Sequence, residues 1–264
     1  MSATTTTPAA VDPRTPGIPF SRLVLVELRK MFNTRSGFWL MMSIGIIAVL
    51  ATLVVILFVP DSAITYGTFA GAFGVPMALL LPIVAILSVT GEWSQRTGLV
   101  TFTLVPHRGS IIAAKAAASV LVGVVSMALA FAIGAVGNIV GAAVNGLDQV
   151  WDADFKDLAL IVLANILGLL IGFMFGILFR NPAGAIVAYL VYGFVLPGLF
   201  GLLAALQDWF EKVQPWVDFN YAQAPLFEGG PSGEEWAQLG TSGLIWFVLP
   251  MTFGVWRVLK AEVK

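Results

Sequence analysis

The sequence predicts an all-α integral membrane protein with six transmembrane helices, an N-terminal amphipathic helix at the membrane interface, and cytoplasmic N- and C-termini. Apolar residues make up 58% of its 264 residues and charged residues only 11%, whereas soluble domains average about 45–50% and about 25%. The mean hydropathy is +0.91. The chain also contains six apolar segments, each near or above the roughly 20 residues that one helical crossing of a bilayer needs.

Two elements precede the first apolar segment. Residues 1–18 are rich in threonine and proline and lack the apolar core of a signal peptide, so we expect a disordered cytoplasmic tail, followed by one transmembrane domain over residues 19–264. Phe20, Val24, Leu28 and Met31 recur at helical spacing, which favours an interfacial amphipathic helix. A solvated basic lead-in to the first span is the alternative. The charged residues of this helix are Arg22, Glu27, Arg29 and Lys30.

The apolar segments predict spans over residues 38–59, 66–90, 111–143, 158–179, 183–206 and 240–259. Pro76 and Pro82 each remove a backbone hydrogen bond, so we expect a bend or a break in the second span. The third segment is longer than one crossing needs, and its first turns, up to Lys115, are expected to extend into the cytoplasmic interface. Pro197 lies near the outer part of the fifth span.

The basic residues set the orientation. On the side of the predicted membrane that holds both termini lie 12 of the 14 lysines and arginines, and only Lys156 and Lys212 lie on the other side. Because basic loops remain in the cytoplasm, the termini are predicted to be cytoplasmic and the protein to lie in the cell membrane. The outer side carries 11 of the 15 acidic residues, without the fixed spacing of a calcium loop. A solvated acidic surface is favoured over a cation-binding site.

Aromatic residues interleave with acids in the last outer segment, residues 207–236. Aromatic side chains at that density favour the headgroup region of a bilayer. We therefore expect short amphipathic helices that rest on or dip into the outer leaflet, where they could form a lid. The aromatic residues are Trp209, Phe210, Trp216, Phe219, Tyr221, Phe227 and Trp236.

Small and polar residues within the spans indicate helix packing. Gly168, Gly172 and Gly176 recur every four residues along the fourth span, a spacing that lets helices approach closely in lipid. Packing within the monomer or across a dimer is favoured over a role in lining a substrate path. Asn138 and Asn165 are expected to form hydrogen bonds between helices, with a ligand-binding role as the alternative.

Several function classes lack their signatures. The chain has no Gly-x-x-x-x-Gly-Lys-Ser/Thr phosphate loop, no His-Glu-x-x-His motif, one histidine and no cysteine. We therefore expect no enzymatic activity, no metal site and no cofactor in this chain. The apolar centres of the predicted spans contain no ionisable residue, which argues against a transporter that uses a buried carboxylate. A sodium site built from backbone carbonyls at the broken second span stays open.

A polar stretch from Gly91 to Arg108 separates the second and third spans. It contains Glu92, Arg96 and Arg108, and the only histidine, His107. A carboxylate at the end of a helix opposes the helix dipole, so Glu92 is expected to have a cationic partner, either Arg96 or a basic group elsewhere. An ordinary cytoplasmic loop with one interfacial salt bridge is the alternative.

These elements together resemble the type-2 export permeases of ATP-binding-cassette (ABC) transporters, in particular the small six-span proteins of actinobacteria. The resemblance lies in the basic helix before the first span, in Lys115 at the start of the third, and in two short motifs, Gly91-Glu92-Trp93 with Arg96-Thr97-Gly98-Leu99, and Thr103-Leu104-Val105-Pro106-His107-Arg108. The order Thr97-Gly98 departs from the usual Gly-Thr and leaves the position of the turn open. The resemblance covers nearly the whole chain in topology.

The resemblance implies a subunit that forms half of a translocation path. A second permease copy or a homologous permease would complete the path, and a pair of separate ATPase subunits would hold ATP and Mg²⁺. It assigns Glu92, Trp93, Arg96, Thr97, Gly98 and Leu99 to a coupling loop in a groove of the ATPase, and the N-terminal helix to an interfacial support. The cargo would be an amphiphile such as a drug, antibiotic, peptide or lipid-like molecule, moved outward.

Other partners and functions follow from the same features. We expect contacts with membrane lipids and none with nucleic acid. A stand-alone secondary transporter or channel-like protein is the alternative function, and a membrane scaffold without transport is a third.

Overall fold

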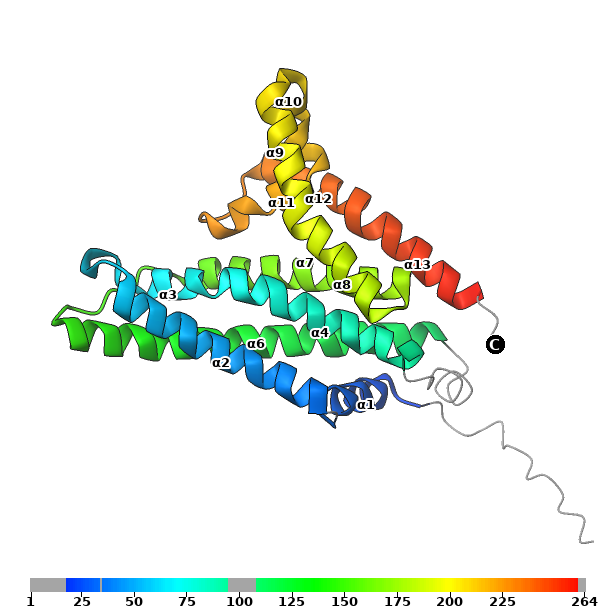
Figure 1. Ribbon diagram of the computed structural model, residues 1–264, viewed down its shortest axis with the longest axis horizontal. Helices are drawn as coiled ribbons and strands as arrows, with labels where there is room; N and C mark the ends of the chain where they lie inside the picture. The colour runs from blue at the N-terminus through cyan, green and yellow to red at the C-terminus, as the bar shows by residue number, and fades with distance from the viewer. Residues whose placement is uncertain (1–17, 34, 95–107, 261–264) are drawn as a thin grey trace, which may run out of the picture.

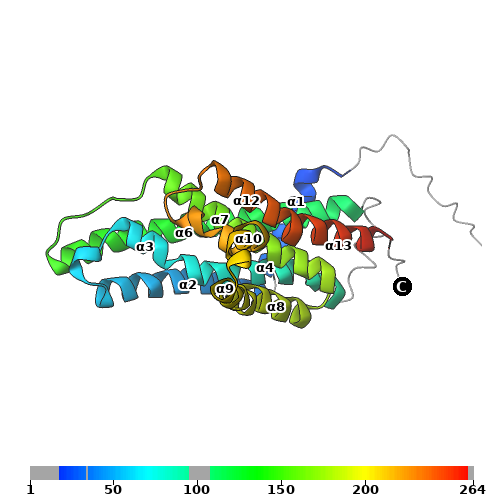
Figure 2. The ribbon, with the colours of Figure 1, turned by 90° about the horizontal axis from the view of Figure 1, so that it is seen from above.

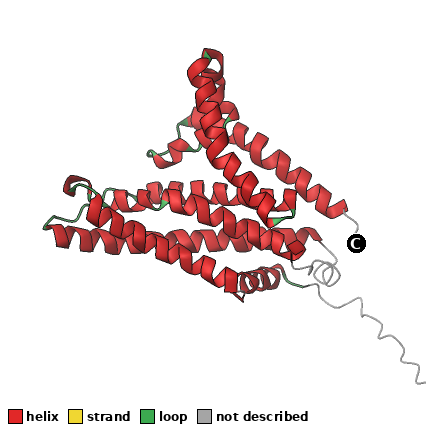
Figure 3. Cartoon of the chain, viewed as in Figure 1, coloured by secondary structure: helices red, strands yellow, loops and turns green. Residues whose placement is uncertain are grey.

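The fold is all-α in the part of the chain that the computed structural model describes, residues 18–33, 35–94 and 108–260. Six helical segments in these ranges are long and apolar enough to cross a membrane, which confirms the predicted multi-pass architecture (Figure 3). They are Gly37–Phe58, Tyr66–Ser94, Gly109–Asn145, Phe155–Phe179, Pro182–Leu206 and Gly233–Lys260. The predicted tail, apart from Ile18, lies outside the described residues.

Four of the spans run side by side along the long axis of the molecule (Figures 1 and 2). They are formed by α2 (Arg35–Phe58), α3 (Tyr66–Ala72) with α4 (Gly74–Ser94), α6 (Arg108–Asn145) and α7 (Phe155–Phe179). Helix α1 (Phe20–Asn33) runs across one end of this layer rather than along it. The described chain begins and ends at the same end, which we call the α1 end.

The second span is broken at Phe73, between α3 and α4, three residues before Pro76. Pro76 occupies the first turn of α4, where its missing N–H has no intrahelical partner to lose. Pro82 lies inside α4 and leaves the carbonyl of Ala78 without a helical donor. The hydroxyl of Tyr189 donates to that carbonyl at 2.5 Å. The proline inside the span is therefore accommodated by a side chain of another helix.

The fifth and sixth spans leave the four-helix layer at an angle (Figure 1). The fifth consists of α8 (Pro182–Leu190), a π-helical turn η2 (Val191–Val195) and α9 (Leu196–Leu206). The sixth repeats this plan with α12 (Gly233–Gly243), a π-helical turn η4 (Leu244–Val248) and α13 (Leu249–Lys260). These two spans have only 11% and 17% of their apolar windows buried, against 44% in the second, third and fourth spans.

Each wide turn precedes a proline, Pro197 in the fifth span and Pro250 in the sixth. A proline ring clashes with the carbonyl four residues earlier, and a π turn moves that carbonyl away. The N–H of Leu196 bonds the carbonyl of Val191, five residues back, which frees the carbonyl of Tyr192. The side-chain amide of Asn220 donates to that freed carbonyl at 3.3 Å.

Short helices connect the fifth and sixth spans, as the sequence predicts. They are α10 (Asp208–Val217), α11 (Phe219–Ala222) and the 3₁₀ turn η3 (Ala224–Phe227); another 3₁₀ turn, η1 (Asp61–Ala63), follows α2. Phe210, Phe219 and Leu226 are buried, and Trp246 of η4 donates its indole N–H to the carbonyl of Val217 at 2.7 Å. The connection thus packs on the spans as well as exposing aromatic residues.

Candidate functional site

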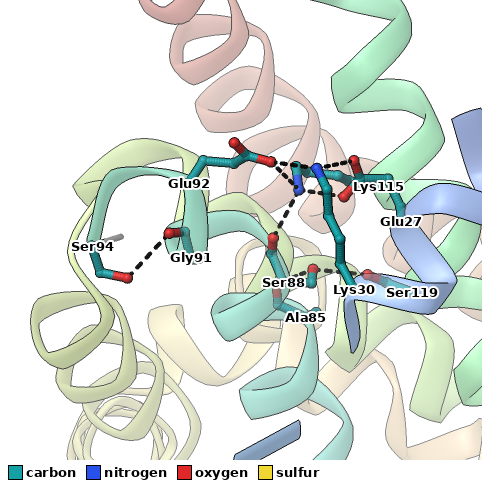
Figure 4. A network of polar contacts seen from close by, with 9 residues as sticks. All are labelled: Glu27, Lys30, Ala85, Ser88, Gly91, Glu92, Ser94, Lys115 and Ser119. Carbon is teal, nitrogen blue, oxygen red and sulfur yellow. Dashed lines mark hydrogen bonds and ion pairs between the residues drawn. The ribbon is translucent and has the colours of Figure 1, made fainter. Parts of the chain in front are cut away.

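Four charged side chains from three helices form a cluster at the α1 end (Figure 4). Glu27 and Lys30 come from α1, Glu92 from the last turn of α4, and Lys115 from α6. Lys30 Nζ lies 2.8 Å from Glu27 and 2.9 Å from Glu92, and Lys115 Nζ lies 2.5 Å from Glu27 and 3.1 Å from Glu92. Each ammonium therefore bridges both carboxylates. We call these residues the charge cluster.

The charge cluster is mostly buried and carries no net charge. Three of its side chains, Glu27, Glu92 and Lys115, are 4–8% exposed, and Lys30 is 44% exposed. Burial disfavours the charged form of Lys30, but the hydrogen bonds and charges of Glu27 and Glu92 outweigh it and raise the Lys30 pKa above 10.5. A buried ion in such a setting needs both a partner and hydrogen bonds. All four residues meet that condition.

Serine side chains extend the charge cluster along α4 and α6. Lys115 also donates a hydrogen bond to the carbonyl of Ser88 at 3.2 Å. The Ser88 hydroxyl lies 3.1 Å from the hydroxyl of Ser119 and also donates to the carbonyl of Ala85. All of these groups are shown in Figure 4. The ends of α4 and α6 are therefore joined by polar contacts within an otherwise apolar bundle.

A cavity of about 540 Å³ opens beside the charge cluster. Helices α1, α2, α4 and α6 and the start of α8 line it, with apolar side chains such as Met31, Leu40 and Val84 next to the charged groups. A cavity of this size, apolar with a few charges, has the composition of a site for a small amphiphilic molecule.

Glu92 has cationic partners among the described residues, as its position at a helix end predicts, whereas Arg96 lies outside those residues. The partners are Lys30 and Lys115, the first on a helix 62 residues earlier in the chain. Trp93 packs against the core and holds the guanidinium of Arg180 over its ring at 5.9 Å. Four predicted coupling-loop residues lie outside the described residues: Arg96, Thr97, Gly98 and Leu99.

The charged residues of α1 divide between its two faces. Arg22 and Arg29 are exposed, whereas Glu27 is the one buried residue of α1 and Lys30 lies above the same face. Lys30 is 44% exposed, and its ammonium reaches both carboxylates of the charge cluster. Leu28 and Met31 pack on the core, but Phe20 is 50% exposed, so the apolar stripe is rotated toward Glu27.

Two of the three predicted packing glycines lie against α4. A Cβ atom on Gly172 would be 2.7 Å from the carbonyl oxygen of Pro82, and one on Gly176 would be 3.1 Å from the Cβ of Val89. Gly168 has more room, with the hydroxyl of Tyr189 at 3.9 Å from the position of a Cβ. Helices α4 and α7 therefore approach most closely where Pro82 meets Gly172.

The two asparagines do not join neighbouring spans through the hydrogen bonds expected of them. Asn138 donates at 3.1 Å to the carbonyl of Val150, in the segment between α6 and α7. Asn165 donates at 2.9 Å to the carbonyl of Ile161, one turn earlier on α7. The Oδ1 atoms of both are buried and have no hydrogen-bond partner among the described residues.

Sequence reasoning missed the roles of Glu27 and Lys115. The signal for Glu27 was present: its position, between Val24 and Met31, puts a lone carboxylate on the apolar stripe of α1. Lys115, in the second turn of α6, is 6% exposed and packed inside the protein, where its ammonium meets Glu27 and Glu92. In the described part of the chain, no group of three or more acidic or histidine side chains could hold a metal ion. The charge cluster is suited to holding helices together.

The sequence matches no protein-family model and no curated protein sequence.

Proposed function

We propose that this chain is the transmembrane subunit of an ABC exporter, which forms the translocation path and is driven by a separate ATPase subunit. The observation that carries the proposal is the charge cluster. It joins α1 to the last turn of α4 and to the second turn of α6, the two helices that flank residues 95–107. A force applied to residues 95–107 would therefore be transmitted to the spans and to α1 together.

The cluster supports coupling because it is costly to separate. Moving α1 away from α4 and α6 would leave buried charges without partners, at roughly 3–5 kcal/mol for one buried partner lost. Helix α1 and the ends of α4 and α6 therefore move as one unit when ATP-driven closure of two ATPase subunits displaces the loop. The long α6, Arg108–Asn145, carries this motion to the opposite end of the bundle.

The amphiphilic cargo follows from the apolar character of the bundle and of the cavity. The cavity at the α1 end combines apolar walls with Glu92, Lys30 and Ser88. On the proposed orientation, with the α1 end in the cytoplasm, it opens where a cytoplasmic or inner-leaflet amphiphile would enter. The sparse packing of the fifth and sixth spans supports a second permease copy or a homologous permease alongside.

A stand-alone secondary transporter is less well supported. Such a protein commonly carries its coupling ion on an intramembrane carboxylate. The buried carboxylates Glu27 and Glu92 are each bridged by two lysines and lie at one end of the bundle. Their charge is already neutralised, as it would be in a structural contact.

Mild-detergent extraction of the protein from its own cells tests the proposal. An ATPase with a phosphate loop should co-purify, and reconstituting the complex should give ATP-dependent activity that falls in Arg96→Ala and Glu92→Ala while the subunits stay assembled. Lys212→Ala, at an exposed position of α10, is the matched control. Flux driven by an ion gradient in vesicles that contain this chain alone would contradict the proposal.

A further inference from the structure

Two arginines lie together where α7 and α13 meet at the α1 end. The helices are in close contact at Gly254, where a Cβ atom would be 2.9 Å from Ile177 Cγ2 and 3.1 Å from Leu178 Cδ2. Both helices run toward the α1 end (Figure 1). Three residues after Ile177 comes Arg180, and three residues after Gly254 comes Arg257. The shared crossing point therefore places the two guanidinium groups at the same end of one helix pair.

The positive charge of this pair is not neutralised by the described residues. All ion pairs among these residues belong to the charge cluster, so neither Arg180 nor Arg257 has a carboxylate partner there. Burial and the nearby charge of Arg257 lower the pKa of Arg180. Arg180 Nε is also buried and has no hydrogen-bond partner among the described residues. No anion among residues 18–33, 35–94 and 108–260 pairs with these two cations.

Aromatic contacts fix the cations of this site. Arg180 ends α7 with a left-handed backbone, φ 52°, and its guanidinium lies 5.9 Å from the ring centre of Trp93 on α4. Arg257 lies 5.8 Å from the ring of Phe253, and Lys260 extends the positive charge one turn further, 4.6 Å from Trp256. Cations held over rings keep their outer donors available to an anion.

Exposed apolar rings surround these cations. Phe179, Phe253 and Trp256 are each 49–53% exposed, and the last two are stacked with ring centres 6.0 Å apart. Aromatic rings beside basic side chains at the end of a span are typical of the headgroup region. Basic pockets between transmembrane helices bind phosphate headgroups of anionic lipids. A soluble anion would leave the rings uncovered, whereas acyl chains would cover them.

We propose that Arg180 and Arg257 bind the phosphate of an anionic phospholipid, with Lys260 as a third cation and with the lipid chains against the exposed rings of α13. The bound lipid then bridges α7 to α13 at the end of the sixth span, which has little protein packing of its own. This site is separate from the charge cluster, and its occupancy does not depend on an ATPase.

Native mass spectrometry of the purified full-length protein in detergent tests the proposal, with added phosphatidylglycerol or phosphatidylcholine of the same acyl chains. The wild type should bind phosphatidylglycerol more tightly. Arg180→Gln and Arg257→Gln should each weaken that binding on the order of fivefold, as expected for one basic group near an anionic lipid, and the double variant on the order of 25-fold if the effects multiply. Arg29→Gln, an exposed arginine at the same end, is the control and should bind as the wild type does.

Further measurements distinguish a lipid phosphate from a soluble anion, and loss of binding from a folding defect. Arg180→Lys keeps the charge and should retain most of the affinity, and a thermal melt in detergent checks the fold of every variant. Glycerol phosphate and inorganic phosphate should fail to displace the lipid. Displacement by inorganic phosphate at equal concentration would assign the site to a soluble anion and overturn the lipid proposal. Equal binding of phosphatidylglycerol by the folded double variant would overturn it too, as expected if an acidic protein segment occupies the arginines.

Discussion

Removing Lys115 should strongly destabilise the fold. Its ammonium contacts Glu27 at 2.5 Å, Glu92 at 3.1 Å and the carbonyl of Ser88 at 3.2 Å. Lys115→Met keeps much of the side-chain length but leaves the two buried carboxylates, among the described residues, with Lys30 as their cation, and that side chain is 44% exposed. Loss of one partner from a buried ion pair costs about 3–5 kcal/mol. We expect a loss of that size in the free energy of unfolding.

Two further variants show whether the loss comes from the charge cluster. Lys30→Met should cost only about 1 kcal/mol, because its ammonium is half in solvent and Lys115 still bridges both carboxylates. Adding Glu27→Gln to Lys115→Met leaves the Lys30 and Glu92 pair, 2.9 Å apart and neutral. The double variant should therefore lose less stability than Lys115→Met alone, by about 1 kcal/mol or more.

Reversible unfolding in mixed micelles, followed by tryptophan fluorescence, measures these differences. Lys212→Met, an exposed lysine on α10, should change the free energy of unfolding by no more than about 0.5 kcal/mol. A Lys115→Met variant as stable as Lys212→Met would show that the charge cluster does not stabilise the fold. Simple addition of the costs of Glu27→Gln and Lys115→Met would show the same, because contacting residues must couple.

Three further outcomes concern packing, hydrogen bonding and pH. Gly172→Ala should lower the free energy of unfolding by about 1–3 kcal/mol, because the new methyl group meets the backbone at Pro82, whereas the roomier Gly168→Ala should not destabilise; chemical unfolding of the pair tests this. Tyr189→Phe should cost about 1–3 kcal/mol in the same assay, since it leaves the carbonyl freed by Pro82 without a donor. The raised pKa of Lys30 contributes stability that is present in full below its unfolded-state pKa of 10.5 and is lost as pH rises through its folded-state pKa. In thermal melts at alkaline pH, the melting temperature should therefore decline less steeply with pH in Lys30→Met than in wild type.

Span positions were predictable from the sequence because hydropathy and helix length are local properties. The predicted second span, 66–90, and third span, 111–143, differ from the structure by at most four residues at any end. The predicted sixth span began at 240, but its helix starts at Gly233, where the capping box of Ser232 and Glu235 opens it. A polar first turn hides the start of a helix from hydropathy alone.

The break in the second span shows where local rules compete. Prolines predict a bend, yet the helix is interrupted at Phe73, a buried residue of the core. Pro76 then falls in the first turn of a new helix, and the cost of Pro82 is met by Tyr189, 107 positions further along the chain. Such a distant partner depends on tertiary contacts that a single sequence does not reveal.

The charge cluster was partly predictable. The helix dipole required a cation for Glu92, and the lone carboxylate of Glu27 on an apolar stripe required one as well. The identity of those cations depends on how α1 crosses the ends of α4 and α6, which is a property of the packed bundle. The predicted coupling-loop residues 96–99 lie outside the described residues, so their contact with an ATPase stays a prediction.

Cross-linking from single cysteines tests the central claim most directly, because the natural chain contains none. In membranes of the native cells, a photo-activated cross-linker on Arg96→Cys should capture an ATPase subunit, and the same reagent on Asp148→Cys or Glu228→Cys, exposed positions on the predicted outer side, should not. Capture of the ATPase from the outer positions, or no capture from Arg96→Cys in a folded protein that reaches the membrane, would contradict the account.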